Sequence, residues 1–361
     1  MSGLHINWGK SHLYPINMVS NMELLASVLG GEVGALPAIY LGMPLGAKSQ
    51  SKEIWNSVLE KCEKKLVRWK AKYLSKGGRH TLINAVLDAL PTYMLTLFPI
   101  PAGVVQRLDK LRRDFFWQGN KKRKGYHLVK WKVMITGKKQ GGLGIKNLKN
   151  QSKALKLKWL WRYAHEPHSM WSKVIKLKYG EMDSWVTKEA TNPYGVTVWR
   201  SIRNWLPFLR NHTTIRVHNG VRTQFWKDRW LGNQNLSEIF PDIFDLALHK
   251  DRTMAEMWSP QGWDLSLRRN LNDWEVCRLV EFFKRLESFQ GLKEGEDCQW
   301  WTEHNKGRYK VSSGYKVMNR APLTLNWPWR QIWKTKISLK VACFTWLLAK
   351  EAVLTHENLR K

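Results

Sequence analysis

The sequence predicts a mainly helical α+β protein of two or three domains. The chain has 361 residues, of which 43% are hydrophobic, so it can bury a sizeable core. After residue 51, apolar residues recur every three or four positions over long stretches, which is typical of amphipathic helices. Short alternating segments bounded by Gly, Asn or Pro predict strands and hairpins between these stretches.

Residues 1–50 are rich in turns and predict only short strands. Residues 4–8 alternate between apolar and polar side chains, and residues 39–41 form a second short apolar segment. Gly30 and Gly31 interrupt the chain between them. Because an isolated pair of strands is marginally stable, we expect this segment to be the edge of a larger sheet.

Residues 51–120 predict three helices joined by short links, as in a helical bundle. The first begins near Ser51 and ends at the glycine pair that starts at Gly77. The second covers about residues 79–90 and is closed by a proline. The third starts after Pro101 and stops at Gly119.

The charge of the chain points to a polyanionic partner. Its 60 basic and 29 acidic residues give a net charge of +31, and phosphate backbones are the usual partner of such an excess. The run at residues 121–124 is alternatively a solvated face or a nuclear import signal. The candidate phosphate-binding residues are Lys61, Lys64, Lys65, Arg68, Lys72, Arg112, Arg113, Lys121, Lys122, Arg123 and Lys124.

Aromatic residues are interleaved with these cations. The chain has 22 tryptophans, and Trp55, Trp69 and Tyr73 lie among the lysines of the first helix. Residues 225–230 (FWKDRW) repeat the mixture. Exposed rings would stack on bases; the alternative is that the rings face the core while the cations are solvated.

The second half predicts two hairpins and further helices. Asn219-Gly220 separates two alternating segments and favours a type I′ turn, and a turn at Gly307 separates residues 299–302 from 308–311. Residues 290–297 are polar and predict a linker, and the chain from Trp327 predicts helix.

No constellation of catalytic or metal-ligating residues is visible. A two-metal polymerase site needs close aspartates, and the chain has no Asp-Asp pair. The acids around Glu294, Glu296 and Asp297 are interpreted as part of a solvated linker. The four cysteines lack the spacing of a zinc or redox pair, which favours a reduced intracellular protein. We therefore predict no catalytic residue, metal ligand, cofactor or small-molecule substrate in this chain.

Several segments together resemble plant LINE-type (non-LTR) reverse transcriptases over essentially the whole chain. The segments that carry the resemblance are residues 3–11 (GLHINWGKS), 40–46 (YLGMPLG), 66–69 (LVRW), 74–79 (LSKGGR), 141–145 (GGLGI), 158–162 (KWLWR), 225–232 (FWKDRWLG), 309–315 (YKVSSGY), 332–334 (IWK) and 344–346 (FTW). The resemblance implies the end of a palm at residues 1–50, a helical thumb-like region at 51–120, a Trp-rich connector at 121–290 and a truncated zinc-binding module at 291–361.

The resemblance also implies what the chain lacks. The family's metal-binding aspartates would precede residue 1, and its Cys and His zinc ligands would follow Lys361, so Mg²⁺ and Zn²⁺ are expected only in the intact parent protein. Cys343 lies before those ligands and is not a candidate. The expected function is binding of RNA or DNA through the phosphate backbone, without polymerisation, and six or more phosphate contacts predict a salt slope near −5.

Three alternatives stay open at this stage. The first alternative is a polymerase piece that needs a partner palm domain. The second is the product of a non-functional translated pseudogene, and the third is a membrane-surface protein. Because the sequence has neither a signal peptide pattern nor an apolar run of the roughly 18 to 20 residues that cross a membrane, we expect a location in the nucleus or cytoplasm and no membrane partner.

Overall fold

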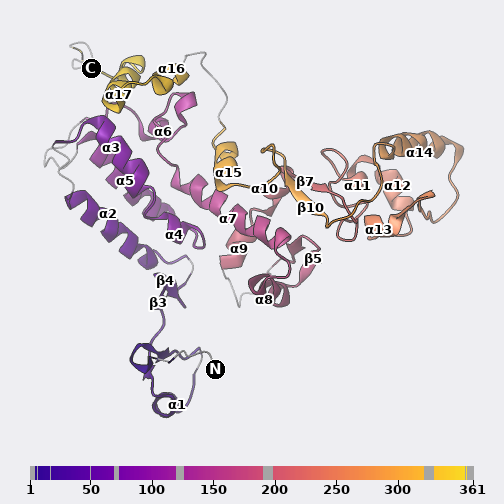
Figure 1. Ribbon diagram of the computed structural model, residues 1–361, viewed down its shortest axis with the longest axis horizontal. Coiled ribbons are helices and arrows are strands. Elements are labelled where there is room, and N and C mark those ends of the chain that lie inside the picture. Colours follow the sequence, from indigo (N-terminus) through magenta and orange to yellow (C-terminus); the bar gives the residue numbers. More distant parts are fainter. Residues whose placement is uncertain are drawn as a thin grey trace. The chain divides into compact units, whose positions relative to one another are not determined.

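The structure is a computed structural model that describes residues 5, 7–16, 18–48, 50–68, 73–118, 126–189, 198–320, 329–353 and 355. The chain divides into two compact units, unit 1 with residues 1–148 and 326–361 and unit 2 with residues 149–325. Helices dominate both units (Figure 1), and every sheet of the described part has two strands. This confirms the predicted mainly helical α+β class. The four-part division of the chain stays a prediction.

Unit 1 combines the N-terminal strands with two groups of helices. Its strands are β1 (His12–Leu13), β2 (Glu32–Val33), β3 (Ala38–Tyr40) and β4 (Met43–Leu45). Its α-helices are α1 (Met22–Leu29), α2 (Asn56–Arg68), α3 (Lys76–Leu82), α4 (Thr92–Leu95), α5 (Ala102–Trp117), α6 (Trp131–Met134), α16 (Trp329–Lys334) and α17 (Leu339–Ala349). Its other helical turns are η1 (Trp8–Lys10), η2 (Glu53–Trp55), the π-helix η4 (Ile83–Leu87) and η5 (Lys138–Gln140).

Unit 2 is built from short helices and short strands around aromatic cores. Its α-helices are α7 (Leu148–His165), which begins at the unit boundary, α8 (Met170–Tyr179), α9 (Val198–Arg203), α10 (Leu206–Asn211), α11 (Leu236–Ile239), α12 (Pro241–Leu246), α13 (Met254–Met257), α14 (Asp273–Leu286) and α15 (Val311–Met318). Its strands are β5 (Glu181–Asp183), β6 (Val186–Thr187), β7 (Thr213–Arg216), β8 (Trp258–Ser259), β9 (Gly262–Trp263) and β10 (Cys298–Trp301).

The helix α2 follows the amphipathic pattern of its sequence. Val58, Leu59, Cys62 and Leu66 are buried at intervals of one, three and four residues, so they form one stripe against the core. The helix ends at Arg68, nearer its start than the glycine pair at which the sequence predicted the end.

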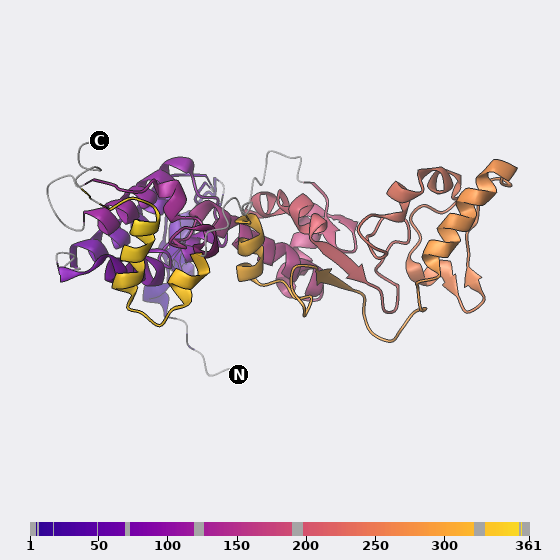
Figure 2. The same ribbon diagram turned by 90° about the horizontal axis from the view of Figure 1, so that it is seen from above.

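Gly77 serves a close approach and does not end a helix. It lies in the first turn of α3, and a Cβ atom there would lie 2.7 Å from the carbonyl carbon of Leu339 in α17. The preceding Ser75 caps α3, because its Oγ accepts a hydrogen bond from the amide of Gly78 at 3.2 Å. Figures 1 and 2 show α17 beside α3 within unit 1.

The second predicted helix is found as α3 and the π-helix η4, which end at Leu87, before Pro91. Pro91 precedes α4, and its carbonyl accepts a hydrogen bond from the amide of Leu95 at 2.9 Å. Proline is tolerated there because the first turn of a helix leaves its amides without intrahelical partners. The third predicted helix is confirmed as α5, which buries Val104, Leu108 and Phe115.

Aromatic rings form the two cores of unit 2. One core includes Trp161, Trp199 and Trp301, and the other includes Trp226 and Phe282. The rings of Trp226 and Phe282 are stacked with their centroids 5.4 Å apart. Much of the tryptophan excess is therefore explained by core packing.

The predicted hairpin at Asn219-Gly220 was wrong. β7 pairs in antiparallel fashion with β10, from Thr213 opposite Trp301 to Arg216 opposite Cys298. The amide of Asn219 instead donates to the carbonyl of Gly295 at 3.1 Å. Residues on both sides of the expected turn therefore bond to a segment distant in sequence and not to each other.

The predicted hairpin around Gly307 was also wrong, although one hydrogen bond of such a hairpin is present. The amide of Trp301 donates to the carbonyl of Gly307 at 2.7 Å, but Lys310 is the N-cap of helix α15. At the N-terminus, the strand predicted at residues 4–8 falls partly outside the described residues, and Trp8–Lys10 forms a 3-10 turn. The strand predicted at residues 39–41 is confirmed as β3, which pairs with β4.

Candidate nucleic-acid interface

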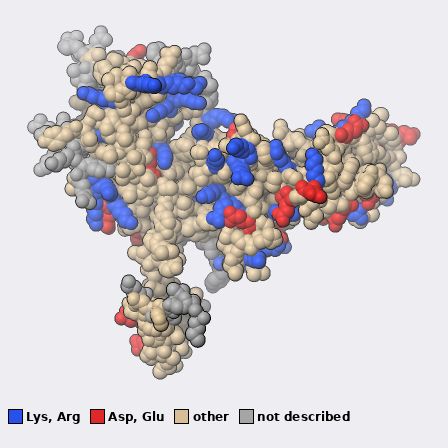
Figure 3. Space-filling view, in the orientation of Figure 1, with Lys and Arg blue, Asp and Glu red and all other residues tan. Residues whose placement is uncertain are grey.

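Two neighbouring helices, α2 and α5, present a group of exposed cations on unit 1. Lys61, Lys64 and Lys65 are exposed on α2, and Lys110 is exposed on α5. The two helices pack against each other, and Figure 3 shows basic side chains gathered over α2. We call these four lysines the α2–α5 basic face.

The lysines of this face have few acidic partners. The Lys64 Nζ lies 4.0 Å from a carboxylate oxygen of Glu60, and both side chains are largely exposed. Lys61, Lys65 and Lys110 form no ion pair with an acid of the described part of the chain. Nearby, Arg107 Nη2 lies 3.0 Å from the Glu63 carboxylate and links α5 to α2. Exposed ion pairs of this kind contribute little to stability, so the lysines are available to an external anion.

Arg112 is not part of this surface, contrary to the sequence prediction. Its side chain is 3% exposed, and its Nη1 donates to Asp88 Oδ1 at 2.5 Å and to the Lys146 carbonyl at 2.9 Å. A second nitrogen, Nη2, bonds to Asp109. The opposite charge of Asp88 across the helix interface draws Arg112 inward, and it is a structural residue.

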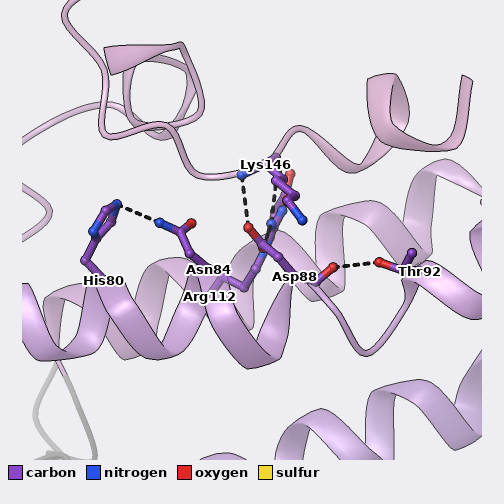
Figure 4. Close-up of polar contacts among 7 residues, drawn as sticks. His80, Asn84, Asp88, Thr92, Arg112 and Lys146 are labelled. Atoms are coloured by element: carbon purple, nitrogen blue, oxygen red, sulfur yellow. Dashed lines mark hydrogen bonds and ion pairs between the residues drawn. The ribbon is translucent and has the colours of Figure 1, made fainter. Parts of the chain in front are cut away.

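A buried polar network surrounds this arginine (Figure 4). Asp88 Oδ2 accepts a hydrogen bond from the Lys146 amide at 3.1 Å, and the Asp88 carbonyl accepts one from Thr92 Oγ1 at 3.0 Å. Burial raises the pKa of the Asp88 carboxyl, and Arg112 opposes the rise. The network joins the end of η4, the helix α5 and the segment before α7.

His80, drawn beside this network in Figure 4, is a neutral core histidine. Its Nε2 lies 2.8 Å from the Leu143 carbonyl oxygen and 3.0 Å from Asn84 Nδ2. Burial lowers its pKa to about 4, so at neutral pH it adds no charge to the basic face.

The other predicted phosphate contacts differ in how far the structure describes them. Arg113 is half-buried, and its Nε lies 3.8 Å from Asp114. Arg68 ends α2, but its side chain lies outside the described part, as do Lys72 and the run Lys121, Lys122, Arg123 and Lys124. These positions stay predictions.

A second group of exposed cations was missed from the sequence. It belongs to α6, η5, α16 and α17, and Figure 3 shows it over α6 and α16. Its sequence signal is weak because the residues come from segments about 200 positions apart, which α16 brings to η5. Its members are Lys132, Lys139, Arg330, Lys334, Lys336 and Lys340.

Three of the predicted stacking rings are in the core. Trp55, Phe225 and Trp226 have no exposed surface, and Trp69 lies outside the described residues. Tyr73, by contrast, is 78% exposed. Few of the predicted rings are therefore exposed enough to stack on a base.

The predicted solvated linker at residues 290–297 is corrected at its last residue. Asp297 is 2% exposed, and its Oδ1 accepts hydrogen bonds from the amides of His218 at 2.7 Å and Gly220 at 2.9 Å. Its Oδ2 accepts from the amides of Arg222 and Thr223, both at 3.1 Å, and from Thr223 Oγ1 at 2.8 Å. This carboxylate organises residues 218–223.

Within the described residues, no three His, Cys, Asp or Glu side chains are placed to hold a metal ion together. The same part of the chain contains no helix with the length and apolarity needed to span a membrane.

Comparisons with known proteins give the chain its relatives. Residues 309–361 match the family model described as zinc-binding in reverse transcriptase. An Arabidopsis thaliana protein named as a ribonuclease H protein is 30% identical over 334 residues, which cover 88% of this chain and 51% of that protein. An uncharacterized mitochondrial protein of Arabidopsis thaliana is 27% identical over 145 residues, which cover 40% of this chain and 93% of that protein. The chain is related to the C-terminal region of plant retrotransposon reverse transcriptases.

This relationship confirms the resemblance to plant retrotransposon reverse transcriptases, and the LINE-type (non-LTR) assignment stays a prediction. The chain spans about half the length of the first relative. The matched zinc-binding segment contains Cys343, which is buried in α17 with its thiol pKa raised by burial to about 11. Among the described residues of this segment, only Cys343 and Glu351 have side chains of the types that ligate zinc, and no three such side chains of the described part are grouped, so these residues do not fit a zinc site with its usual three or four protein ligands.

Proposed function

We propose that this reverse-transcriptase-related chain binds RNA or DNA through the phosphate backbone, with the α2–α5 basic face as the main contact. The observation that carries the proposal is the set of exposed lysines on α2 and α5 that face few acids. Lysine neutralises phosphate without reading sequence, because releasing condensed counterions supplies the free energy. Binding should therefore be sensitive to salt and tolerant of sequence.

The experiment removes three of these charges at once. In the triple variant Lys61→Gln/Lys65→Gln/Lys110→Gln, affinity for a single-stranded oligonucleotide at about 0.1 M salt should fall on the order of a hundredfold, from the loss of three counterion-releasing contacts. Fluorescence anisotropy measures the affinity.

A matched control removes three exposed lysines of unit 2. The triple variant Lys284→Gln/Lys306→Gln/Lys316→Gln makes the same change in net charge on residues that are equally exposed. Its affinity should stay within a few-fold of the wild type. Equal losses in the two triple variants would show that only net charge matters and would remove the proposed face.

The proposal includes no bound metal and no catalysis by the isolated chain. Chelation with EDTA should leave the oligonucleotide affinity unchanged. Because the parent is taken to be a LINE-type (non-LTR) element, a nuclear or cytoplasmic location is part of the proposal, and microscopy of a tagged chain tests it.

The second candidate function is a polymerase piece that needs a palm domain. The feature that favours it is the exposure of apolar side chains beside the short N-terminal strands, including Ile16, Val28 and Ile39. A primer-extension assay with Mg²⁺, run alone and with a complementing palm domain, separates the two candidates. Incorporation only with the palm domain would favour the second, and incorporation by the isolated chain would contradict both.

A pseudogene product that folds poorly and a membrane-surface protein are the remaining alternatives. Broad hydrogen-exchange protection across α2, α3 and α5 would argue against the first of these. Binding to anionic vesicles that competes with oligonucleotide would favour the second.

A further inference from the structure

The second group of cations on unit 1 lies in segments of the chain without acidic residues. The sequence has no Asp or Glu between Asp114 and Glu166, and none between Glu303 and Glu351. The first segment supplies α6 and η5, and the second supplies α16 and α17. Because neighbours in sequence cannot neutralise such long basic segments, their charge depends on acids from elsewhere in the fold or on an external anion.

The fold fixes these two segments against each other. η5 packs on α16, and α16 packs on α17. The Nζ of Lys138 lies 4.7 Å from the centroid of the Trp333 ring, and the Nε1 of Trp346 donates a hydrogen bond to the Gly141 carbonyl at 2.9 Å. Trp346 is fully buried. A buried ring with its polar atom bonded anchors both segments, so the cations around it are carried on a fixed surface.

Six cations are exposed on this surface. α6 and η5 carry two of them, and α16, α17 and the link between these two helices carry four. None of the six forms an ion pair with an acid of the described residues, and Figure 3 shows basic side chains gathered over α6 and α16. We call the six the α6–α17 basic face: Lys132, Lys139, Arg330, Lys334, Lys336 and Lys340.

An exposed aromatic ring adjoins this face. Phe344 follows Lys340 by four residues on α17, so the two side chains lie on the same side of the helix. Phe344 is 53% exposed, whereas Trp329 and Trp346 are buried. Cations beside an exposed ring suit a single strand, because the cations neutralise the backbone while the ring stacks on a base. In a duplex the faces of each base are covered by neighbouring bases, so the ring adds little.

We propose that the α6–α17 basic face binds single-stranded nucleic acid, with its cations on the phosphates and the Phe344 ring stacked on one base. This inference rests on the proposed nucleic-acid binding and extends it to a second surface that selects the unpaired form. An anionic membrane is the competing partner, since Val341 and Leu348 are also exposed on α17. Nucleic acid is favoured because only Lys340 of the six cations lies on α17, whereas a membrane-surface helix carries its cations and its apolar face together.

The first experiment removes three cations of the face. In the triple variant Lys334→Gln/Lys336→Gln/Lys340→Gln, affinity for a single-stranded oligonucleotide at about 0.1 M salt should fall on the order of a hundredfold, because each phosphate contact of a single strand contributes about −0.7 to the slope of log affinity against log salt. The unit 2 variant Lys284→Gln/Lys306→Gln/Lys316→Gln makes the same change in net charge and is the control. Equal affinities of these two variants would overturn the proposal.

The second experiment tests the ring. Phe344→Leu keeps an apolar side chain but removes the stacking surface, so it should weaken single-strand binding at least about fivefold and leave the affinity for a duplex of the same sequence unchanged. Phe344→Trp should bind single strands at least as tightly as the wild type does. Phe283→Leu, at an exposed phenylalanine of α14, is the matched control and should bind both forms as the wild type does. Unchanged single-strand affinity in Phe344→Leu, or an equal loss for both forms, would contradict the proposal.

Anionic vesicles decide between the two partners. Vesicles of phosphatidylcholine and phosphatidylserine should not displace a bound single-stranded oligonucleotide from the wild-type chain at the same salt concentration. Displacement by the vesicles would assign the α6–α17 basic face to a membrane and overturn the proposal.

The triple variants of the two basic faces separate this inference from the proposed function. Both variants should lose single-strand affinity. If the α6–α17 variant loses affinity and the α2–α5 variant does not, the α2–α5 basic face is wrong and this inference stands. If only the α2–α5 variant loses affinity, this inference is wrong and the proposed function stands.

Discussion

Basic residues occur both on α2 and in unit 2, but they differ in their interaction partners. On α2, Lys61 and Lys65 are exposed and have no acidic partner in the described part of the chain. In unit 2, Arg269 bonds through both terminal nitrogens to Glu275, and the Arg216 guanidinium lies 3.0 Å from the centroid of the Trp300 ring. Cations that already have partners gain less from a phosphate, so Arg269 and Arg216 should contribute less to backbone binding than Lys61 and Lys65 do.

Unit 1 also contains a paired cation. Arg112 is buried and ion-paired, although it lies on the same helix as the exposed Lys110. Arg112→Met should lower the free energy of unfolding by about 4 kcal/mol, because it leaves the buried Asp88 carboxylate without its counter-charge. Urea unfolding measures the change. Lys110→Met should cost less than about 0.5 kcal/mol, and a similar cost for both would contradict their different roles.

Asp297 tests whether buried charge is equally structural in unit 2. Asp297→Ala should cost about 3 kcal/mol, because four backbone amides and the Thr223 hydroxyl lose their acceptor. Asp297→Asn keeps one acceptor oxygen and should cost less. Unfolding followed by tryptophan fluorescence measures both, and a neutral Asp297→Ala would show that residues 218–223 hold their shape without the carboxylate.

Lys156 on α7 is a buried cation of unit 2 that forms no ion pair with an acid of the described residues. It is 5% exposed, and burial lowers its pKa to about 8 from the ordinary lysine value of 10.5. In the folded state the charged form is disfavoured, so stability should rise as pH increases from about 8 to 10.5. Lys156→Met should add about 2 kcal/mol at pH 7 and remove this dependence. A variant that is no more stable at pH 7 would show that the ammonium reaches solvent.

Local features were predictable from the sequence, and partners distant in sequence were not. The stripe of α2 and the helix α5 follow from the periodicity of their own residues. The hairpin at Asn219-Gly220 failed because Asp297, far along the chain, takes the amides on which a local turn would depend. Arg112 was placed on the surface because nothing in the sequence shows that Asp88 faces it.

The candidate site was predictable to the same extent. The exposed lysines of α2 were found because an amphipathic helix shows its polar side in sequence. The cations near α16 were missed because only the fold brings them to η5. In unit 2, Asp228 and Arg229 line a pocket, whereas Phe225 and Trp226 of the same motif, FWKDRW, are buried in a core. The pocket was missed because the motif alone does not show which of its side chains are buried.

The salt dependence of oligonucleotide affinity tests the central claim most directly. For a duplex oligonucleotide, the slope of log affinity against log salt should be close to −5 for the wild type and shallower by about 2.7 in Lys61→Gln/Lys65→Gln/Lys110→Gln, since each phosphate contact of a duplex contributes about −0.9. The control triple variant in unit 2 should keep the wild-type slope. A flat wild-type response, or an unchanged slope in the α2–α5 variant, would contradict the account.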